Sequence, residues 1–353
     1  MRIAHFLPNL TVGGRERIAN DLARAGRALG QQPMLVGYEP VAANIATLTP
    51  QVEYVQLDRH DAGFVAKLRD LFRRERIALV HAHGHIAAVH LAQAIQGWAD
   101  RPASLATMHL GMQGTWRWLW SIRRALRAMD GLNAVSNDLA TTYATIAGRA
   151  VATIPNGIEC APYLAIDPLL PFAGAPFRFA MLSRLDPVKR HIDAVHAADR
   201  LIERGSDIEL HIAGEGAMSA QIGDLASTRP WVRLAGSVDP LAFLSDKQVF
   251  LMPSRAEGSP LALIEAMASG LPSIVSDLPS LRALAGDAAH FVAVAHHDAM
   301  ADEMGQLMTQ PTQWRAMSRR ARSRAKTLDL SVSSRRYCAI YADLVAAGRA
   351  DAA

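Results

Sequence analysis

Short runs of aliphatic and β-branched residues alternate along this chain with longer amphipathic stretches, and this alternation limits the fold more than any other feature. Such a pattern is typical of parallel sheets with helices on both faces. It runs from residue 2 to residue 154, gives way to a Pro-, Gly- and Ala-rich stretch from Pro155 to Pro176, and restarts at Phe177. The chain has 353 residues, more than one hydrophobic core usually organises. We therefore expect two α/β domains, each a doubly wound, Rossmann-like sheet.

The hydrophobic period places the individual elements. In the first half, strands are expected over Arg2–Leu7, Met34–Val36, Tyr54–Leu57, Ala78–His81, Ser104–Met108, Gly131–Val135 and Val151–Ile154, and helices over Arg15–Leu29, Phe64–Arg74, Ile86–Gln96, Trp116–Met129 and Asp138–Ile146. In the second half, strands are expected over Phe177–Leu182, Glu209–Ala213, Val232–Leu234, Val249–Met252, Ser273–Val275 and His290–Val292, and helices over Arg190–Glu203, Ala217–Leu225, Pro260–Ser269, Met300–Thr309, Thr312–Lys326 and Ser331–Ala347.

Composition excludes several classes of protein. Half of the residues are hydrophobic and a fifth are charged, as in globular chains, and no apolar run reaches the roughly 18 residues that span a membrane. Cys160 and Cys338 are the only cysteines, so neither a disulfide framework nor a thiolate metal site is expected. The stretch before Pro8 is too short for a secretory leader. We expect a cytoplasmic protein.

The most specific segment is E-G-S-P-L-A-L-I-E at residues 257–265. Its two glutamates stand eight positions apart, Glu257 in a loop and Glu265 inside the expected helix. A carboxylate in such a helix can accept two hydrogen bonds from a vicinal diol, such as that of a ribose. The plain alternative is a solvated pair of glutamates on a surface helix.

The residues between these glutamates suit an anion. Gly258 and Ser259 place backbone N–H groups at a helix N-terminus, where unpaired donors and the helix dipole favour negative charge. Pro260 is expected at the first helical position, because it has no N–H to lose there. Apolar packing would explain the helix itself but not Gly258 or the acidic loop.

A second segment, S-R-L-D-P-V-K-R-H at residues 183–191, follows the first expected strand of the second half. Arg184 and Lys189 stand five residues apart around a turn, where two cations can hold a diphosphate and offset the charge of a leaving group. Lys189 is one of only four lysines in this arginine-rich chain. The plain alternative is a solvated turn at the end of a strand.

Two weaker signals lie in the first half. Gly13 and Gly14 join the first expected strand to the first helix, and paired glycines let a backbone approach a phosphate closely, although such turns are common. His109 follows the expected strand over Ser104–Met108. A lone histidine there is more often a satisfied polar residue than a functional one, but the carboxyl end of a strand is where these folds bind ligands.

Together these segments resemble, in order, the G-G-x-E, R-L-x-x-x-K and E-x7-E elements of the family-4 (group 1) retaining glycosyltransferases. That family has the GT-B fold, in which two Rossmann-like domains face each other across a cleft and a C-terminal helix packs back on the first domain. The resemblance implies an acceptor-side domain over residues 1–158, rejoined by the last helix at about 331–353. It implies a nucleotide-sugar-binding domain over residues 159–330.

The resemblance also assigns roles. It implies that Glu257 lies against the donor sugar and that Glu265 holds the ribose hydroxyls. Arg184 and Lys189 would bind the diphosphate, and His109 matches a histidine that reaches the sugar or its phosphate. The implied catalytic residues are Glu257, His109, Lys189 and Arg184. The implied donor-binding residues are Gly13, Gly14, Arg184, Lys189, Gly214, Gly258, Ser259, Pro260, Leu261 and Glu265.

On this resemblance we expect transfer of a hexose from a UDP- or GDP-linked donor to a saccharide acceptor, lipid-linked in cell-surface polysaccharide assembly, with retention of anomeric configuration. The departing phosphate would help to deprotonate the acceptor, and the two cations would offset its charge, so no metal and no cofactor are expected. The sequence departs from the family after the strand over Ser273–Val275. Relatives often carry Gly-Gly and then Glu there, and this chain has neither.

Other classes fit less well. A nucleotide-sugar epimerase on the same fold is the nearest alternative and differs in needing no acceptor. A sugar-nucleotide-binding protein without catalysis would be expected to lack Glu257 or Lys189. The G-x-G at Gly214 and Gly216 favours an NAD-dependent oxidoreductase, but Ser219 replaces the third glycine and no acidic residue ends the next strand.

The expected helix at Trp116 could contact a membrane. Trp116, Trp120, Arg123 and Arg127 form a stripe of aromatic and basic groups suited to an anionic lipid surface on the inner face of the membrane. Residues 1–165 hold 17 Arg and Lys against 12 Asp and Glu, while the remainder holds 20 against 21. This excess is too mild to identify a partner, and no nucleic acid is expected. The alternative is a docked helix with a solvated arginine face.

The run His81-Ala82-His83-Gly84-His85 has the spacing of metal ligands, since alternate residues of a strand share one face. No Asp, Glu or Cys stands beside it to complete a site. We therefore expect no metal, and expect these histidines to make polar contacts on the acceptor side.

Overall fold

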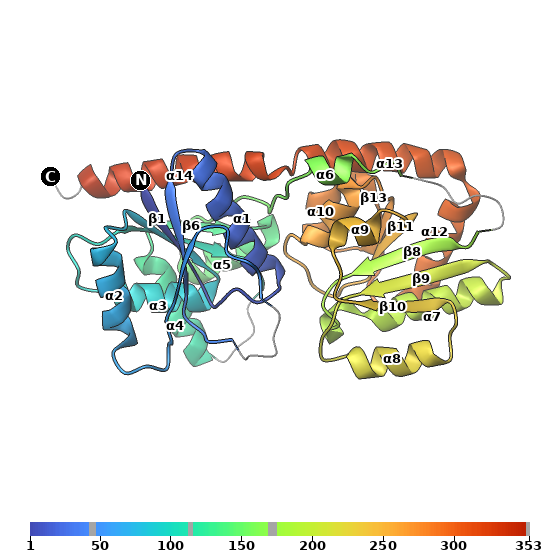
Figure 1. Cartoon of the computed structure of the whole chain (residues 1–353), viewed down its shortest axis with the longest axis horizontal. Coiled ribbons are helices and arrows are strands. Elements are labelled where there is room, and N and C mark those ends of the chain that lie inside the picture. Colours follow the sequence, from blue (N-terminus) through green and yellow to red (C-terminus); the bar gives the residue numbers. More distant parts are fainter. Residues whose placement is uncertain (42–46, 112–115, 169–174, 351–353) are drawn as a thin grey trace. The chain divides into compact units, whose positions relative to one another are not determined.

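The chain divides into two compact units, each with its own parallel sheet (Figure 1). The computed structural model describes residues 1–41, 47–111, 116–168 and 175–350. The first unit comprises Met1–Gly157 and Leu330–Ala353, and the second comprises Ile158–Asp329. The chain thus leaves the first unit once and returns to it for its last helix.

The sheet of the first unit has seven parallel strands in the order β3-β2-β1-β4-β5-β6-β7. The strands are β1 (Arg2–Leu7), β2 (Gln32–Gly37), β3 (Glu53–Gln56), β4 (Leu79–His83), β5 (Ala103–Met108), β6 (Gly131–Ala134) and β7 (Ala152–Thr153). The helices are α1 (Gly14–Ala28), α2 (Phe64–Arg74), α3 (His85–Ile95), α4 (Trp116–Ala128), α5 (Asn137–Ala147) and α14 (Leu330–Ala350). The chain extends the sheet from β1 in one direction and then, from β4, in the other, which is the doubly wound order.

The two faces of this sheet differ, because successive residues of a strand point to opposite faces. Phe6, Val80 and Ala106 belong to an apolar core packed under α2, α3, α4 and α5. His5 and His81, one position away on the same strands, belong to the other face, where α1 and α14 pack. The first unit therefore has an apolar face and a partly polar one, and both are buried.

The sheet of the second unit has six parallel strands in the order β10-β9-β8-β11-β12-β13, again doubly wound. The strands are β8 (Phe177–Leu182), β9 (Ile208–Ala213), β10 (Val232–Gly236), β11 (Val249–Met252), β12 (Ser273–Ser276) and β13 (Ala289–Val292). The helices are α6 (Ala161–Leu164), α7 (His191–Glu203), α8 (Ser219–Ser227), α9 (Pro240–Leu244), α10 (Leu261–Ala268), α11 (Pro279–Ala285), α12 (His297–Thr309) and α13 (Pro311–Lys326). A separate core that includes Phe179, Leu251 and Trp314 fills this unit.

The expected strands are all present within two residues at each end, and the expected helices within three. The expected position of Pro260 is wrong. Helix α10 begins at Leu261, and Pro260 precedes it with an extended backbone at φ −69° and ψ 125°. The expected linker from Pro155 to Pro176 contains the short helix α6, and its residues 169–174 lie outside the described part of the chain.

Candidate active site

Two of the segments singled out by the sequence meet at the carboxyl ends of the strands of the second sheet. Strands β8 and β11 pair in parallel although β9 and β10 lie between them in sequence, so the winding direction of the sheet changes here. Doubly wound sheets bind their ligands at the carboxyl ends of the strands at such a point. The loop after β8 carries Arg184 and Lys189, and the loop after β11 carries Glu257. The backbone N–H of Arg255 donates to the carbonyl of Val188 at 2.8 Å and joins the loops.

Lys189 and Glu257 form an ion pair across this point, with Nζ 2.7 Å from Oε1. Lys189 ends a 3-10 turn over Pro187–Lys189, which aims it from the β8 loop towards the β11 loop. The side chain of Lys189 is 18% exposed and that of Glu257 is 4% exposed. Water screens such a pair weakly, so each charge depends on the other, or on a substrate, for compensation.

Arg184 differs from Lys189 in its surroundings. Its side chain is 65% exposed and pairs with Asp186 at 2.7 Å, so solvent weakens this ion pair. Beneath the turn, Nε2 of the buried His191 lies 2.9 Å from the hydroxyl of Ser183. Burial, and then the charge of Lys189, lower the pKa of His191 to about 4, so this ring is neutral near pH 7.

The G-x-G after β9 has a packing role in this structure. Gly214 has φ +131°, and a Cβ at this position would lie 1.9 Å from the carbonyl oxygen of Ser183. A Cβ on Gly216 would lie 2.6 Å from the carbonyl oxygen of Leu185. The two glycines therefore let the loop after β9 pack directly against the backbone of the loop that carries Arg184. Close packing of the two loops therefore accounts for both glycines.

The second carboxylate of the E-x7-E pattern lies inside α10. Glu265 is 2% exposed, and its Oε1 accepts a hydrogen bond from the Tyr163 hydroxyl at 2.9 Å. Gly258 and Ser259 are buried just before this helix begins. Tyr163 lies in α6, within the stretch expected to be a linker, and is not among the site residues expected from the sequence.

The remaining predicted donor residues lie in the first unit. Gly13 precedes α1 and Gly14 is its first residue. A Cβ on Gly13 would lie 2.6 Å from Oε2 of Glu16, so the carboxylate packs against the glycine backbone. Glu16 is 5% exposed and accepts from Nε of Arg15 at 2.8 Å. Thus Glu16, which completes the G-G-x-E pattern, is a buried ion-pair partner at this helix start.

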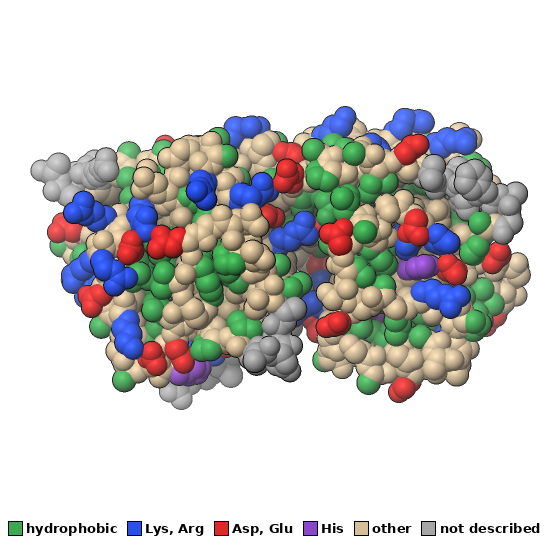
Figure 2. Space-filling view, in the orientation of Figure 1, with side chains coloured by type: hydrophobic (Ala, Val, Ile, Leu, Met, Phe, Trp, Pro, Cys, Tyr) green, Lys and Arg blue, Asp and Glu red, His purple; other side chains and the backbone are tan. Residues whose placement is uncertain are grey.

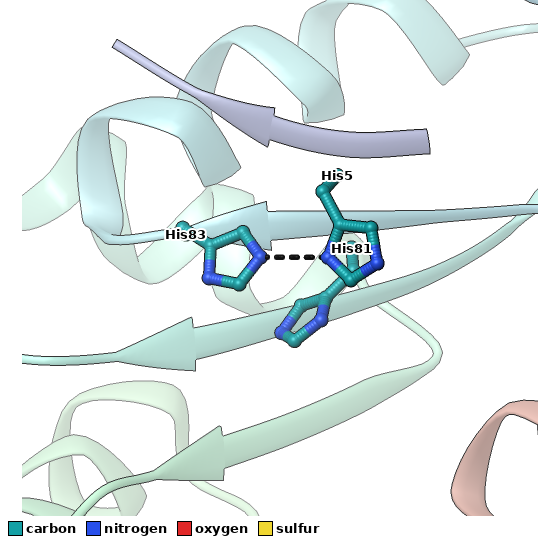
Figure 3. A group of neighbouring side chains, drawn as sticks. All are labelled: His5, His81 and His83. Atoms are coloured by element: carbon teal, nitrogen blue, oxygen red, sulfur yellow. Dashed lines mark hydrogen bonds between the residues drawn. The ribbon is translucent and has the colours of Figure 1, made fainter. Parts of the chain in front are cut away.

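His109 directly follows β5 and is 8% exposed. Its Nε2 lies 3.3 Å from Nδ1 of His83, and Nε2 of His83 lies 3.1 Å from Nδ1 of His5 (Figure 3). His81 lies beside them, with Nδ1 2.7 Å from the Tyr341 hydroxyl. His5 was not singled out from the sequence, although a histidine between apolar neighbours of a buried strand is a detectable signal.

The expectation for the His81-His83-His85 run is wrong in part. His81 and His83 are fully buried, His81 against Tyr341 of α14, and they are not available to an acceptor, while His85 is the first residue of α3 and packs against Trp118. The group whose ring nitrogens could share an ion is His5, His81 and His83, within 4.8 Å of one another. Among the described residues, no carboxylate or thiol joins this group.

Solved proteins share the fold of the whole chain. It is similar to HepE from Anabaena, solved in complex with UDP, with a TM-score of 0.82 at 15% identity over 97% of this chain and 100% of that one. It is also similar to sucrose-phosphate synthase from Thermosynechococcus elongatus, with a TM-score of 0.81 at 18% identity over 98% and 100%. Identities this low show the fold alone, and the fold is GT-B.

Family models match both units. The model for Glycosyltransferase Family 4 matches residues 12–162, and the model for Glycosyl transferases group 1 matches residues 176–310. The two matches together span most of both sheets. The chain belongs to the group 1, family 4 glycosyltransferases.

Curated relatives match parts of the chain. A phosphatidyl-myo-inositol mannosyltransferase from Mycolicibacterium smegmatis is 32% identical over 57% of this chain and 54% of its own length. A UDP-Gal:alpha-D-GlcNAc-diphosphoundecaprenol alpha-1,3-galactosyltransferase from Escherichia coli is 24% identical over 62% of each chain. The chain thus spans less than two thirds of the length of either relative.

Proposed function

We propose that the chain is a retaining hexosyltransferase that moves a hexose from a UDP- or GDP-linked donor to a saccharide acceptor. The observation that carries this proposal is the Lys189–Glu257 ion pair, 2.7 Å long, where β8 and β11 meet. A cation and a carboxylate at the carboxyl edge of a doubly wound sheet are placed for a ligand with both a diphosphate and a sugar. The group 1 family match over residues 176–310 supports the same assignment.

Each residue of the β8 and β11 loops receives a role. Lys189 and Arg184 bind the diphosphate, and the exposed Arg184 can exchange its partner Asp186 for a phosphate at little cost. Glu257, once its cation turns to the phosphate, orients the sugar and stabilises positive charge at the anomeric carbon. Glu265, held by Tyr163, accepts from the ribose hydroxyls.

The other donor contacts come from backbone and from the first unit. The N–H groups of Gly258 and Ser259, before α10, meet the sugar or the diphosphate, with Pro260 and Leu261 setting their direction. Gly214 shapes the Arg184 loop by its close packing on Ser183. The remaining proposed contacts to the donor come from the first unit: Gly13, Gly14 and His109.

Retention follows from a same-face substitution in this proposal. The departing phosphate helps to deprotonate the acceptor hydroxyl, and Arg184 and Lys189 offset the charge that grows on the leaving group. The work of the protein is then positioning and electrostatic stabilisation, without a metal ion. A product with inverted anomeric configuration, seen by proton NMR, would contradict this mechanism.

The identity of the donor base is proposed from the relatives' printed names. HepE was solved with UDP and with UDP-glucose, and the Escherichia coli relative uses UDP-Gal. UDP-hexoses are therefore the first donors to test, followed by GDP-mannose because another relative is a mannosyltransferase.

A lipid-linked acceptor at the inner face of the membrane is the last part of the proposal. In the exposed part of α4, Trp120 is 66% exposed and Leu119 37%, beside the exposed Arg123 and Arg124. The side chain of Trp116 lies outside the described residues, and Arg127 instead donates to the Ala147 carbonyl at 3.0 Å.

Other observations bear on membrane and nucleic-acid partners. Figure 2 shows acidic and basic side chains interspersed over the visible face of each unit, without the single-sign surface that nucleic acid requires. Among the described helices, none is long and apolar enough to cross a bilayer.

Liposome binding tests the exposed surface of α4. We expect the wild type to bind anionic but not neutral liposomes, and we expect the double variant Trp120→Ala with Arg123→Ala to lose this binding. Equal binding by this variant would contradict it.

The decisive test measures transfer with Glu257→Gln and Lys189→Met beside a matched control. Lys247 is also a buried lysine of the second unit, but it lies just before β11, at the amino end of that strand and not at the carboxyl end. We expect both site variants to lose transfer from every UDP- and GDP-hexose and Lys247→Met to keep it. Full activity in either site variant would refute the assignment, as would a thermal shift with NAD alone.

A further inference from the structure

Three histidines of the first unit form a continuous chain of ring contacts that ends at His109. Nδ1 of His5 lies 3.1 Å from Nε2 of His83, and Nδ1 of His83 lies 3.3 Å from Nε2 of His109. The rings come from β1, β4 and the end of β5, and the strand register sets their spacing. Figure 3 shows the first of these contacts.

Each end of this row of histidine rings has one ring nitrogen that forms no hydrogen bond with the described residues. Nε2 of His5 and Nδ1 of His109 are buried and have no hydrogen-bond partner among the described residues. His5 lies inside the sheet, 1% exposed, whereas His109 lies at the carboxyl edge where this class of sheet binds ligands. The end at His109 is therefore the one nearer to the place where this class of sheet binds a substrate.

The rings in the chain are neutral near pH 7. Burial lowers the pKa of His5 to about 4, and burial together with the nearby charge of Arg15 lowers that of His109 to about 3. Burial and the neighbouring rings also hold the pKa of His83 well below its ordinary value. A neutral imidazole has one N–H and one bare nitrogen. A ring that accepts a hydrogen bond at one nitrogen therefore carries its N–H, the donor, on the other nitrogen.

Only two proton arrangements satisfy this rule. If His5 donates to His83, then His83 donates to His109, and Nδ1 of His109 carries an N–H. In the reverse arrangement, His5 keeps a permanently buried N–H without a partner. Buried unpaired N–H groups are rarer in proteins than buried unpaired acceptors. The first arrangement is therefore favoured, because it leaves the open N–H at the end that a ligand can satisfy.

The same rings could instead be read as metal ligands, since His5, His81 and His83 converge. His81 argues against this. Its Nδ1 lies 2.7 Å from the Tyr341 hydroxyl, and its Nε2 lies 2.7 Å from the Thr107 hydroxyl, so both nitrogens are used. A cation in this group would also lie near the positive charge of Arg15, with no carboxylate in the described group to offset either charge.

We propose that His5 and His83 are positioning residues that fix the ring and tautomer of His109, so that its Nδ1–H is offered to an oxygen of the nucleotide-sugar donor. This inference rests on the proposed function of the site, since it gives His109 a donor substrate. It adds two residues, buried and away from the substrate, that determine whether His109 donates or accepts.

The test uses the fact that an asparagine amide overlays Nδ1 of histidine and a glutamine amide overlays Nε2. His83→Asn keeps a partner for His109 but loses His5, while His83→Gln keeps His5 but loses His109. We expect His83→Gln to lower kcat by about 10- to 100-fold, with a smaller change in KM, and His83→Asn, which lacks only the His5 contact, to lower kcat less, by about 3- to 10-fold. At position 109, Asn should likewise retain more activity than Gln.

Controls separate positioning from stability. His81 is equally buried on the same strand but contacts Tyr341 and Thr107, so His81→Asn and His81→Gln should lower the melting temperature without the Asn-over-Gln preference in kcat. Equal kcat for His83→Asn and His83→Gln, at matched melting temperatures, would overturn the proposal, because a merely structural role predicts it.

Nitrogen-15 NMR of histidine-labelled wild type provides a readout that needs no turnover. We expect His109 to be the Nδ1–H tautomer, and His83→Gln to lose that preference. An Nε2–H tautomer in the wild type, or one divalent metal per chain by elemental analysis that is lost in His83→Asn, would overturn the proposal. Absence of any sugar transfer would instead refute the proposed function, and the tautomer would still be decided by the spectra.

Discussion

At the scale of single residues, Lys189 and Glu257 depend on each other unequally. The side chain of Glu257 is 4% exposed and that of Lys189 is 18% exposed, so the carboxylate has less access to water when its partner is removed. We expect Lys189→Met to lower the free energy of unfolding by about 1–3 kcal/mol, because it leaves a buried charge unpaired. Glu257→Gln removes that charge and should cost less. Urea unfolding of both variants measures the difference, and a larger loss in Glu257→Gln would contradict this account.

Gly214 provides a second prediction at this scale. Its φ of +131° and the 1.9 Å approach of the Ser183 carbonyl to any Cβ leave no room for a side chain. We expect Gly214→Ala to destabilise the second unit by about 1–3 kcal/mol and to displace the Arg184 loop. Gly223 is the matched control, because it lies within α8 with open space around it, and alanine there should be neutral or stabilising. Equal melting temperatures for both variants would contradict the prediction.

At the scale of elements, α14 is fixed to the first sheet by hydroxyl groups as well as by apolar packing. The Tyr341 hydroxyl meets Nδ1 of His81 at 2.7 Å, and the Tyr337 hydroxyl accepts from Nδ2 of Asn133 at 2.8 Å. Tyr341→Phe would leave His81 unpaired at that nitrogen, so we expect a loss of about 1–3 kcal/mol in urea unfolding. Arg335→Ala, at an exposed position of the same helix, should change little. A Tyr341→Phe value as small as that of Arg335→Ala would show that the hydroxyl contact is unimportant.

The elements also show what the sequence could and could not predict. Long periodic elements such as α2 and β8 were predicted to the residue, whereas α9 and α11 are too short for a helical period to be recognised. The sequence could predict that the Lys189 and Glu257 loops share a sheet edge, because that follows from strand order. It could not predict which cation pairs with Glu257, since side-chain conformation decides that. Nor could it predict that His5 meets His83, which depends on the register between β1 and β4.

At the scale of the whole molecule, each unit has its own sheet and core, so the two need not lose structure under the same conditions. Their buried histidines differ. The first unit holds a cluster in which burial lowers each pKa: His5, His81, His83 and His109. In the second unit, burial likewise lowers the pKa of His191 to about 4 and that of His211. Acid should therefore act more strongly on the first unit.

The sign of the effect follows from proton linkage. Unfolded histidines titrate near 6.5, whereas folded His5 titrates at about 4, so between these values the unfolded state binds more protons and stability falls as pH falls. We expect amide hydrogen exchange, corrected for its intrinsic pH dependence, to show β1 and β4 losing protection before β8 and β11 as pH drops from about 7 to about 4.5. His81→Gln places an uncharged side chain at position 81, so it should weaken the pH dependence of protection in β1 and β4. Earlier loss in β8 and β11 would mean that the buried histidines do not control the acid response.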